Sequence, residues 1–496
     1  MKTLWQKKPK EKNAGTDGGP DRTWFYHFTA GEDRELDRQL VPYDILVNMA
    51  QARMLLKIGI YTADGSEKVT SALREAWQMW CRGDFDLGPE DEDVHSAVEK
   101  FLTQMAGEDG ARIHTGRSRN DQVLADMRLF MKDAILEIAG EWLRIAHRLE
   151  KLANVYRGVC FAGLTHTQPA MPHSVDAWAS GYLDMLRSDL IAFRQAFELI
   201  DQSPLGSAAG YGVPHIPVDR EFLANELGFA ALQVPVAVSQ LSRGRFEMQL
   251  VDALSYGALS FNRMASDVVL FMHPSWSLVT LSEDQVSGSS IMPQKRNPDA
   301  WELIRAGYHD LQANRLHLSA VPANLTSGYH RDLQLVKKSV MSALRQSKLL
   351  AEAVRHALTG LEFDREAAGR TLTDDLFATH HANRLVSRGV PFREAYRQVA
   401  ESGGRQSSAI KPGAMISGTE ESTEKKSGGS AAKESCPQES VPYSQTIIET
   451  YHHSGAPGTG IPDYILKDVR QLQKWVSEQK EHSEKTKQNL LNESGT

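Results

Sequence analysis

One polar stretch of the chain, residues 114–122 (HTGRSRNDQ), carries side chains that could bind a carboxylate. Arg119 offers a guanidinium fork that matches a carboxylate, and Ser118 and Asn120 offer further hydrogen-bonding groups. The stretch lies directly before a long apolar stripe, so free amide N–H groups and the positive end of a helix dipole would also attract an anion there. A structural reading is equally open, because Asn120 or Asp121 would serve as the N-cap of that helix.

A second stretch, residues 163–174 (GLTHTQPAMPHS), places His166 between two threonines, where it could transfer a proton. On the residues alone a structural role for this single histidine is favoured. Pro169 and Pro172 predict a helix start or a turn. The chain contains no H-x-x-x-H or H-E-x-x-H spacing, so we expect no metal site.

A third stretch, residues 287–299 (SGSSIMPQKRNPD), reads as a loop that leads into a helix. Ser289, the backbone amides around it, and Lys295 supply a hydroxyl, N–H donors and a cation. This is the set of groups needed to hold a substrate carboxylate and the negative charge that develops beside it. Composition alone is equally compatible with a mobile lid that closes over a substrate and with a linker that has no catalytic role.

Long amphipathic helices must position these stretches. Apolar residues recur at steps of three and four from Val123 to Leu152, and similar spacing occurs over 175–200, 250–272 and 302–318. Helices of this length predict a long helical bundle, in which the apolar residues are ordinary core.

Shorter helical units are predicted on both sides of the bundle, over 33–110 and 364–400, whereas the Gly/Pro-rich residues 205–218 read as a loop. β signals are sparse, so the expected fold class is all-α. In residues 401–440, fifteen of the 40 residues are Ser or Gly, and few are apolar. We expect a poorly ordered insertion there, because little apolar burial is available to offset the ordering entropy.

Composition excludes several classes of protein. The 496 residues carry 56 Lys and Arg against 63 Asp and Glu, a net charge of −7 without a basic block, which argues against nucleic-acid and membrane partners. Three cysteines cannot build a disulfide framework and favour a reducing compartment. We find no apolar run of about 18 residues and no secretory signal in residues 1–15, so we expect a cytoplasmic protein of about three domains.

Four blocks together resemble one known family. SGSSIMPQKRNPD (287–299) is similar to the GSSxMPxKxNP signature of the fumarase/aspartase superfamily. HTGRSRNDQ (114–122) resembles the version found in argininosuccinate lyases and the related δ-crystallins, and LTHTQPAMP (164–172) resembles their THxQ block. SGYHRDLQLVK (327–337) has the Tyr, Gln and Lys spacing of the family's substrate loop. The similarity extends over about residues 28–400.

The resemblance implies reversible cleavage of argininosuccinate into arginine and fumarate, without a cofactor. It implies three mostly helical domains, at residues 1–112, 113–363 and 364–496, with a five-helix bundle in the middle one. Four copies would form a homotetramer with a twenty-helix core, in which each active site takes blocks from three subunits. Blocks 114–122 and 287–299, placed at opposite ends of long helices, would meet in this way.

The resemblance also assigns roles to residues. The reaction removes a proton beside a carboxylate and expels a guanidinium nitrogen, so it needs a base, an acid and stabilisation of a carbanion. Ser289 would be the base, assisted by Lys295, and His166 would protonate the leaving nitrogen with Glu302 orienting it; the acid and base labels of Ser289 and His166 stay open. The expected substrate-binding residues are Ser118, Arg119, Asn120, Thr165, Arg243, Asn297, Tyr329, Gln334 and Lys337.

The chain departs from the family pattern near its N-terminus. DRELD (33–37) places Asp33 where many relatives have a substrate-binding serine, so Thr29 or Arg34 is a candidate for the missing contact.

Two alternatives to an argininosuccinate lyase remain. The first is another lyase of the superfamily, acting on adenylosuccinate, aspartate or malate, and blocks 114–122 and 327–337 count against it. The second is a non-catalytic, crystallin-like structural protein. The presence of Ser289, His166 and Lys295 counts against that reading.

Overall fold

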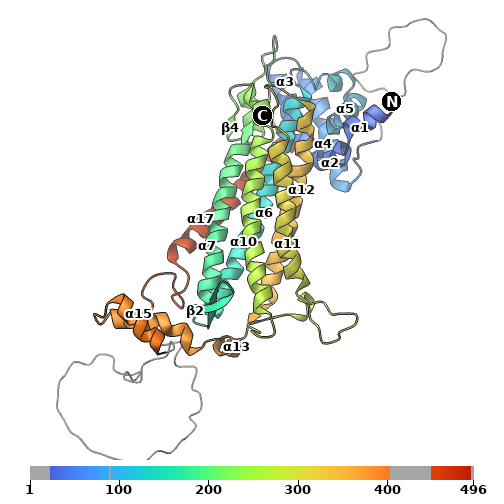
Figure 1. The fold of residues 1–496 in the computed structure, drawn as a ribbon. Helices are drawn as coiled ribbons and strands as arrows, with labels where there is room; N and C mark the ends of the chain where they lie inside the picture. The colour runs from blue at the N-terminus through green and yellow to red at the C-terminus, as the bar shows by residue number, and fades with distance from the viewer. Residues whose placement is uncertain (1–22, 89–90, 403–447, 449, 493–496) are drawn as a thin grey trace, which may run out of the picture.

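The computed structural model describes residues 23–88, 91–402, 448 and 450–492. In these residues long helices run side by side as a rod, and smaller helices gather at both of its ends (Figure 1). The insertion predicted at 401–440 lies outside the described residues, apart from its first two.

Five long helices form the rod, and four of them coincide with the ranges predicted from the apolar spacing. The fifth, α12, completes the bundle that the resemblance implied. α6 packs against α7 and α12, and α10 packs against α7, α11 and α12. Their bounds are α6 (Arg119–Val155), α7 (Val175–Ile200), α10 (Arg245–Phe271), α11 (Asp299–Ala320) and α12 (Leu335–Ala357).

The start of α6 is set by a capping box. The Ser118 hydroxyl accepts from the Asn120 amide at 3.3 Å, and the Ser118 amide donates to Asp121 Oδ1 at 3.0 Å. The N-cap is therefore Ser118, and the reading of Asn120 or Asp121 as the cap was wrong. A hydroxyl cap stabilises a helix start by about 1 kcal/mol. From it α6 runs 37 residues, about 55 Å at 1.5 Å per residue.

Trp142 of α6 lies at the centre of the bundle core. It is 1% exposed, and its ring meets those of Phe193 at 4.2 Å and Phe261 at 5.6 Å between centroids. Gly257 of α10 gives this ring its space, because a Cβ at that position would lie 1.9 Å from Trp142. Tight packing of this kind explains a glycine in the middle of a long helix.

The N-terminal helices cover one end of the rod, and their apolar core is continuous with that of the bundle. The helical unit predicted over 33–110 is confirmed. The elements of this layer are α1 (Thr23–Ala30), α2 (Asp33–Asp37), the 3-10 turn η1 (Arg38–Leu40), α3 (Val41–Lys57), α4 (Ala63–Arg82) and α5 (Val94–Ala111).

Connections at the same end of the rod link α7 to α10 and α11 to α12. Most of 205–218 forms no helix or strand, as predicted. The short elements here are β3 (Gln202–Ser203), α8 (Arg220–Glu226), β4 (Ala231–Leu232), α9 (Val238–Leu241) and η3 (Arg331–Gln334); β3 and β4 pair in parallel.

The opposite end of the rod carries a hairpin of β1 (Cys160–Thr165) and β2 (Gln168–Ser174). Pro169 and Pro172 lie in β2, directly after the turn at 166–167. Of the two predicted alternatives, a turn is present next to these prolines, whereas the helix start was wrong, because α7 begins only at Val175. Both strands of a two-stranded hairpin are edges, which is why prolines are tolerated there.

Further short elements complete this end, and β5 pairs antiparallel with β6. They are β5 (Val279–Leu281), η2 (Glu283–Gln285), η4 (Leu358–Gly360), β6 (Leu361–Phe363), α13 (Arg365–Arg370), η5 (Asp374–Phe377), α14 (Ala378–Val386) and α15 (Phe392–Glu401).

The C-terminal helix α17 (Asp463–Leu491) runs back along the rod and packs against α6, α7 and α3. Trp475 meets Phe197 edge to face with ring centroids 5.4 Å apart, and Lys487 pairs with Asp133 at 2.8 Å. Among the described residues, none of the helices is both long and apolar enough to cross a membrane. The expected mostly helical fold with a long central bundle is confirmed.

Candidate active site

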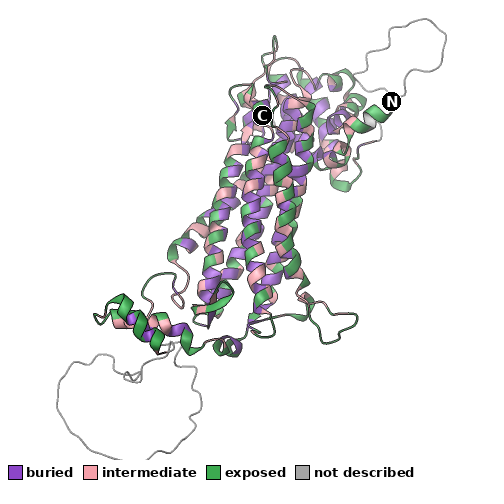
Figure 2. Ribbon diagram, viewed as in Figure 1, coloured by how far each residue is buried: buried purple, intermediate pink, exposed green. Residues whose placement is uncertain are grey.

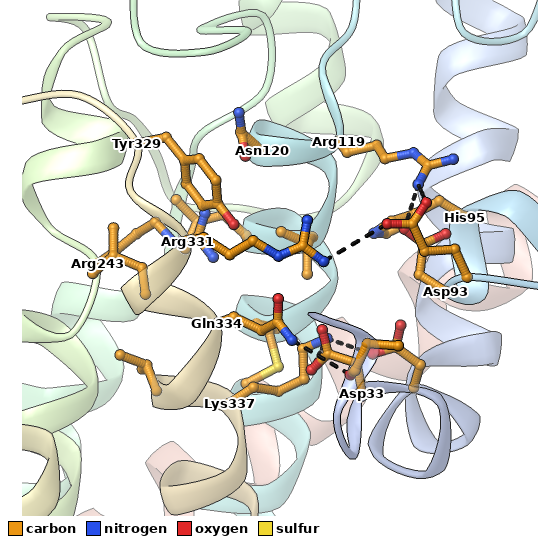
Figure 3. A pocket seen from close by; sticks show the side chains of 18 of the residues that line it. Asp33, Asp93, His95, Arg119, Asn120, Arg243, Tyr329, Arg331, Gln334 and Lys337 are labelled. Atoms are coloured by element: carbon orange, nitrogen blue, oxygen red, sulfur yellow. Dashed lines mark hydrogen bonds and ion pairs between the residues drawn. The ribbon is translucent and has the colours of Figure 1, made fainter. Parts of the chain in front are cut away.

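A cavity of about 200 Å³ opens between the N-terminal layer and the bundle, at the end of the rod where α6 and α12 begin (Figure 3). Its walls come from α2, residues 92–95, the first turns of α6, the start of α10 and the segment 329–337. Six of the predicted substrate-binding residues line it: Arg119, Asn120, Arg243, Tyr329, Gln334 and Lys337.

Lys337 forms the floor of the cavity with two carboxylates of α2. Its Nζ lies 2.5 Å from Asp37 Oδ1 and 3.4 Å from Asp33 Oδ1. Burial lowers the pKa of Lys337, but the two anions outweigh it and raise that pKa above its ordinary value. The ammonium therefore stays charged in this site.

Arg119 faces the acidic residues before α5. Its guanidinium lies 2.8 Å from Asp93 Oδ2 and 3.2 Å from Glu92 Oε2. Burial opposes ionisation of Asp93, but the charges of His95 and Arg119 outweigh it and lower the pKa of that carboxyl. These contacts hold the guanidinium at the cavity wall.

Gln334 and Arg331 connect the substrate-loop block to α1. Their side chains each donate to the backbone oxygen of Thr29 at 2.9 Å. Arg331 also lies 3.8 Å from Glu92, so this segment bridges both parts of the N-terminal layer.

Arg243 lies on the other side of the cavity, 5.0 Å above the ring of Tyr329. Its Nη1 atom is buried without a hydrogen-bond partner among the described residues, and burial lowers its pKa. A buried donor left unpaired is costly, so a ligand carboxylate at this position would be stabilising.

Several cavity residues were not among the predicted site residues: Asp33, Asp37, Glu92, Asp93, His95, Glu247 and Arg331. The acidic run before α5 and the closeness of Arg331 to Gln334 in sequence are the signals that could have found some of them. Asp33, which stands where many relatives have a serine, lines the cavity, whereas the two candidates for the missing contact, Thr29 and Arg34, are not among its lining residues. Thr29 Oγ1 donates to Phe25 O at 2.8 Å, and Arg34 donates to Asp91 O at 3.2 Å.

Behind His95 lies a buried cluster with Asp44 and Asp126, whose nearest polar atoms all lie within 4.8 Å of one another. Asp44 accepts from His95 at 2.8 Å, Gln122 at 2.6 Å and Asn48 at 2.9 Å, so its oxygens are satisfied by hydrogen bonds. Both carboxylate oxygens of Asp126, by contrast, are buried without a hydrogen-bond partner among the described residues.

His166 lies at the far end of the rod, at the tip of the β1–β2 hairpin, and Thr165 is beside it at the end of β1. Both are exposed. The turn places His166 at φ 54° and Thr167 at φ 60°. Non-glycine residues in the left-handed region are strained, and such strain is concentrated at functional sites.

The loop that carries Ser289 lies at the same far end, before α11. An antiparallel bridge between Ser287 and Asn297 closes its base. Within it the Ser289 hydroxyl accepts from the amides of Ile291 and Met292 at 3.4 and 3.2 Å. Lys295 is exposed in this loop, and Glu302 is exposed in the first turn of α11.

The predicted site residues therefore form two groups at opposite ends of one chain. α10 alone separates them by 27 residues, about 40 Å at 1.5 Å per residue. The cavity group holds anion-binding and acidic side chains, whereas the far group holds His166, Ser289 and Lys295. Within one chain these two groups do not meet.

Comparison with known proteins identifies the fold. A variant of EDDS lyase with bound fumarate matches with a TM-score of 0.74 over 94% of each chain at 19% identity. A class II fumarase from Schistosoma mansoni matches with a TM-score of 0.63, over 76% of this chain and 91% of its own, at 16% identity. The chain thus has the helical-bundle fold of these two proteins.

Sequence comparison identifies the family. A family model described as "Lyase" matches residues 26–310. The argininosuccinate lyase of Thermotoga neapolitana is 41% identical over 76% of this chain and 95% of its own length. That of Phocaeicola vulgatus is 38% identical over 78% and 86%. The chain belongs to the argininosuccinate lyase family.

Proposed function

We propose that this protein cleaves argininosuccinate reversibly into arginine and fumarate, and so serves arginine biosynthesis in the cytoplasm. The observation that carries the proposal is the identity of 41% with a whole argininosuccinate lyase, together with the 114–122 and 287–299 blocks. No observation favours the adenylosuccinate, aspartate, malate or structural alternatives.

The proposed assembly is a homotetramer of three-domain subunits, with domains at 1–112, 113–363 and 364–496. Exposed residues run along the bundle helices (Figure 2), and several of them are large and apolar. They support the assembly, because a monomer rarely leaves so many apolar side chains in water. On α11, Leu303 and Leu316 are each 72% exposed. Light scattering on the purified protein should give a mass of four chains.

The proposed chemistry starts at the loop of the far end. Ser289 would take the proton beside the succinyl carboxylate, and Lys295 and Asn297 would hold that carboxylate. The carbon–nitrogen bond then breaks, and fumarate forms as His166 returns a proton to the guanidinium nitrogen, with Glu302 orienting the imidazole. The amides that donate to Ser289 also favour its anion, which a serine base requires.

Substrate binding is proposed for the cavity residues. Arg119, Asn120, Arg243, Tyr329, Gln334 and Lys337 would bind the rest of argininosuccinate, with Thr165 supplied from the far end of another copy. Ser118 would contribute through its hydroxyl, which can donate its proton to the substrate while its oxygen accepts from the Asn120 amide.

The direct test is release of fumarate from argininosuccinate by the purified protein, followed by absorbance. Adenylosuccinate, aspartate and malate are assayed separately as alternative substrates. Turnover of one of these without turnover of argininosuccinate would overturn the proposal.

A further inference from the structure

The hairpin of β1 and β2 carries His166, and it has little structure of its own. A two-stranded hairpin is only marginally stable when it stands alone. Its turn also holds His166 and Thr167 at positive φ. Strained residues keep such a conformation only where the surrounding structure enforces it. The contacts that support the two strands therefore determine where His166 lies.

The support of β1 ends at Ala162. Phe161 belongs to the main core of the protein, whereas Ala162, which is 1% exposed, is buried in a second, small apolar cluster with Leu376 and Phe377 of η5. No residue from 163 to His166 is buried. Ala162 is therefore the last buried position of β1 before the histidine.

Thr371, directly after α13, holds this last buried position. Its Oγ1 accepts from the Ala162 amide at 2.9 Å and donates to the backbone oxygen of Ala368 at 2.7 Å. The sheet that contains β1 has two strands. The Thr371 hydroxyl thus takes the place that a third strand would have at the edge of β1.

A cavity of about 240 Å³ lies beside this hydrogen bond. Residues of both strands, of the loop 274–277 and of α13 line it, among them Ala162, Pro169 and Thr371. A buried amide that loses its acceptor is costly, so β1 would move to expose that amide to water. The cavity gives the strand room for such a movement.

We propose that Thr371 is a positioning residue for His166. This inference rests on the proposed function, in which His166 returns the proton to the leaving nitrogen. Ala162 lies four residues before His166 on the same strand and turn, so a shift of Ala162 is transmitted to the imidazole. A displacement of about 1 Å at a reacting group can lower a rate about 100-fold. Thr371 thereby gives α13 a part in the reaction without touching the substrate.

Steady-state kinetics of variants of the full-length protein test this role. Thr371→Val keeps the shape of the side chain but removes the hydroxyl. It should lower kcat about 10- to 100-fold and leave KM unchanged, because substrate binding is proposed for the cavity at the other end of the rod. Thr371→Ser keeps the hydroxyl and should retain wild-type turnover. The matched control is Thr359→Val at the same end, where an exposed hydroxyl donates to Arg355 O at 3.1 Å; it should change nothing.

A double variant tests whether Thr371 acts through the histidine. In a His166→Asn background, Thr371→Val should lower kcat no further, because the group that Thr371 positions is already absent. Hydrogen exchange of the unliganded protein, followed by mass spectrometry, measures the hairpin directly. Thr371→Val should speed exchange of the amides in 160–165, whereas Thr359→Val should not.

Unchanged kcat in Thr371→Val, an equal loss in Thr371→Ser, or a further loss in the His166→Asn background would overturn the inference. If Thr371→Val fails to fold by circular dichroism, the wild-type protein still decides. Its Ala162 amide must exchange slowly, and rapid exchange would show that Thr371 does not hold the strand. Cleavage of argininosuccinate that is independent of Thr371 overturns this inference and keeps the proposed function. Faster exchange of the hairpin in Thr371→Val, in a protein whose wild type cleaves no argininosuccinate, overturns the function and leaves Thr371 as the support of the hairpin.

Discussion

Lys337 Nζ lies 2.5 Å from Asp37 Oδ1, and this buried ion pair joins α12 of the bundle to α2 of the N-terminal layer. Removing the ammonium by Lys337→Met leaves two carboxylates without a partner. We expect a loss of about 3–5 kcal/mol in the free energy of unfolding, the usual cost of breaking a buried pair. Asp37→Asn should cost less, because Asp33 remains as a partner for the lysine.

Urea unfolding of both single variants and of the double variant measures the interaction energy between Lys337 and Asp37. The double variant should be more stable than Lys337→Met alone, since it buries fewer unpaired charges. Additive losses would show that the two side chains stabilise the fold independently.

A second prediction concerns the neutral acid behind the cavity. Burial, and next to it the charge of Asp44, raises the pKa of Asp126 well above its ordinary value. Arg117 also faces this cluster. Burial lowers the pKa of His95, but the anions around the imidazole outweigh burial and raise that pKa. A folded-state pKa above the unfolded value contributes stability that is lost as the pH rises through the folded value. Asp126→Asn cannot ionise, so its stability relative to wild type should rise with pH.

Melting temperatures from pH 5 to pH 9 test this relation. Asp44→Asn is the contrasting variant, because the pKa of Asp44 is lowered and its anion is the partner of His95. It should lose about 3 kcal/mol or more near neutral pH, as for other broken buried pairs. A constant difference between Asp126→Asn and wild type across this range would contradict the assignment of a neutral carboxyl.

The long helices could be predicted because burial repeats along them with a helical period. Trp142 and Leu152 stand on one stripe, and that stripe is the buried face of α6. The hairpin around His166 could not be predicted in the same way. Its strands are short, and prolines 169 and 172 suggest a break when they are read without the neighbouring strand.

The cavity shows a second limit of what can be predicted from the sequence. Arg119, Tyr329 and Lys337 belong to recognisable blocks, so their place in the site could be expected. Asp33 and Asp93 come from elements whose arrangement only the packing of α2 and α5 against the bundle determines.

Complementation tests whether the site is shared between copies. Asn120→Ala changes the cavity end and Ser289→Ala changes the far end, and each should lower turnover by orders of magnitude. In tetramers assembled at random from equal amounts of the two variants, about one quarter of the sites would combine an intact cavity from one subunit with an intact Ser289 loop from another. We therefore expect activity to return on mixing after reversible dissociation. Mixed tetramers that form but stay inactive would contradict a shared site.

The packing of α6 against α10 gives the last prediction. A Cβ on Gly257 would lie 1.9 Å from Trp142 Cη2, and the indole has no room to retreat because rings of Phe193 and Phe261 hold it. Gly257→Ala should therefore destabilise the protein by about 3 kcal/mol, the upper part of the usual cost of overpacking, despite the better helix propensity of alanine. The control is Gly369→Ala in α13, where a new Cβ meets nothing within 4 Å and should stabilise by up to about 1 kcal/mol. Calorimetric melting of the two variants decides the matter, since equal effects at both positions would mean that Trp142 can move aside.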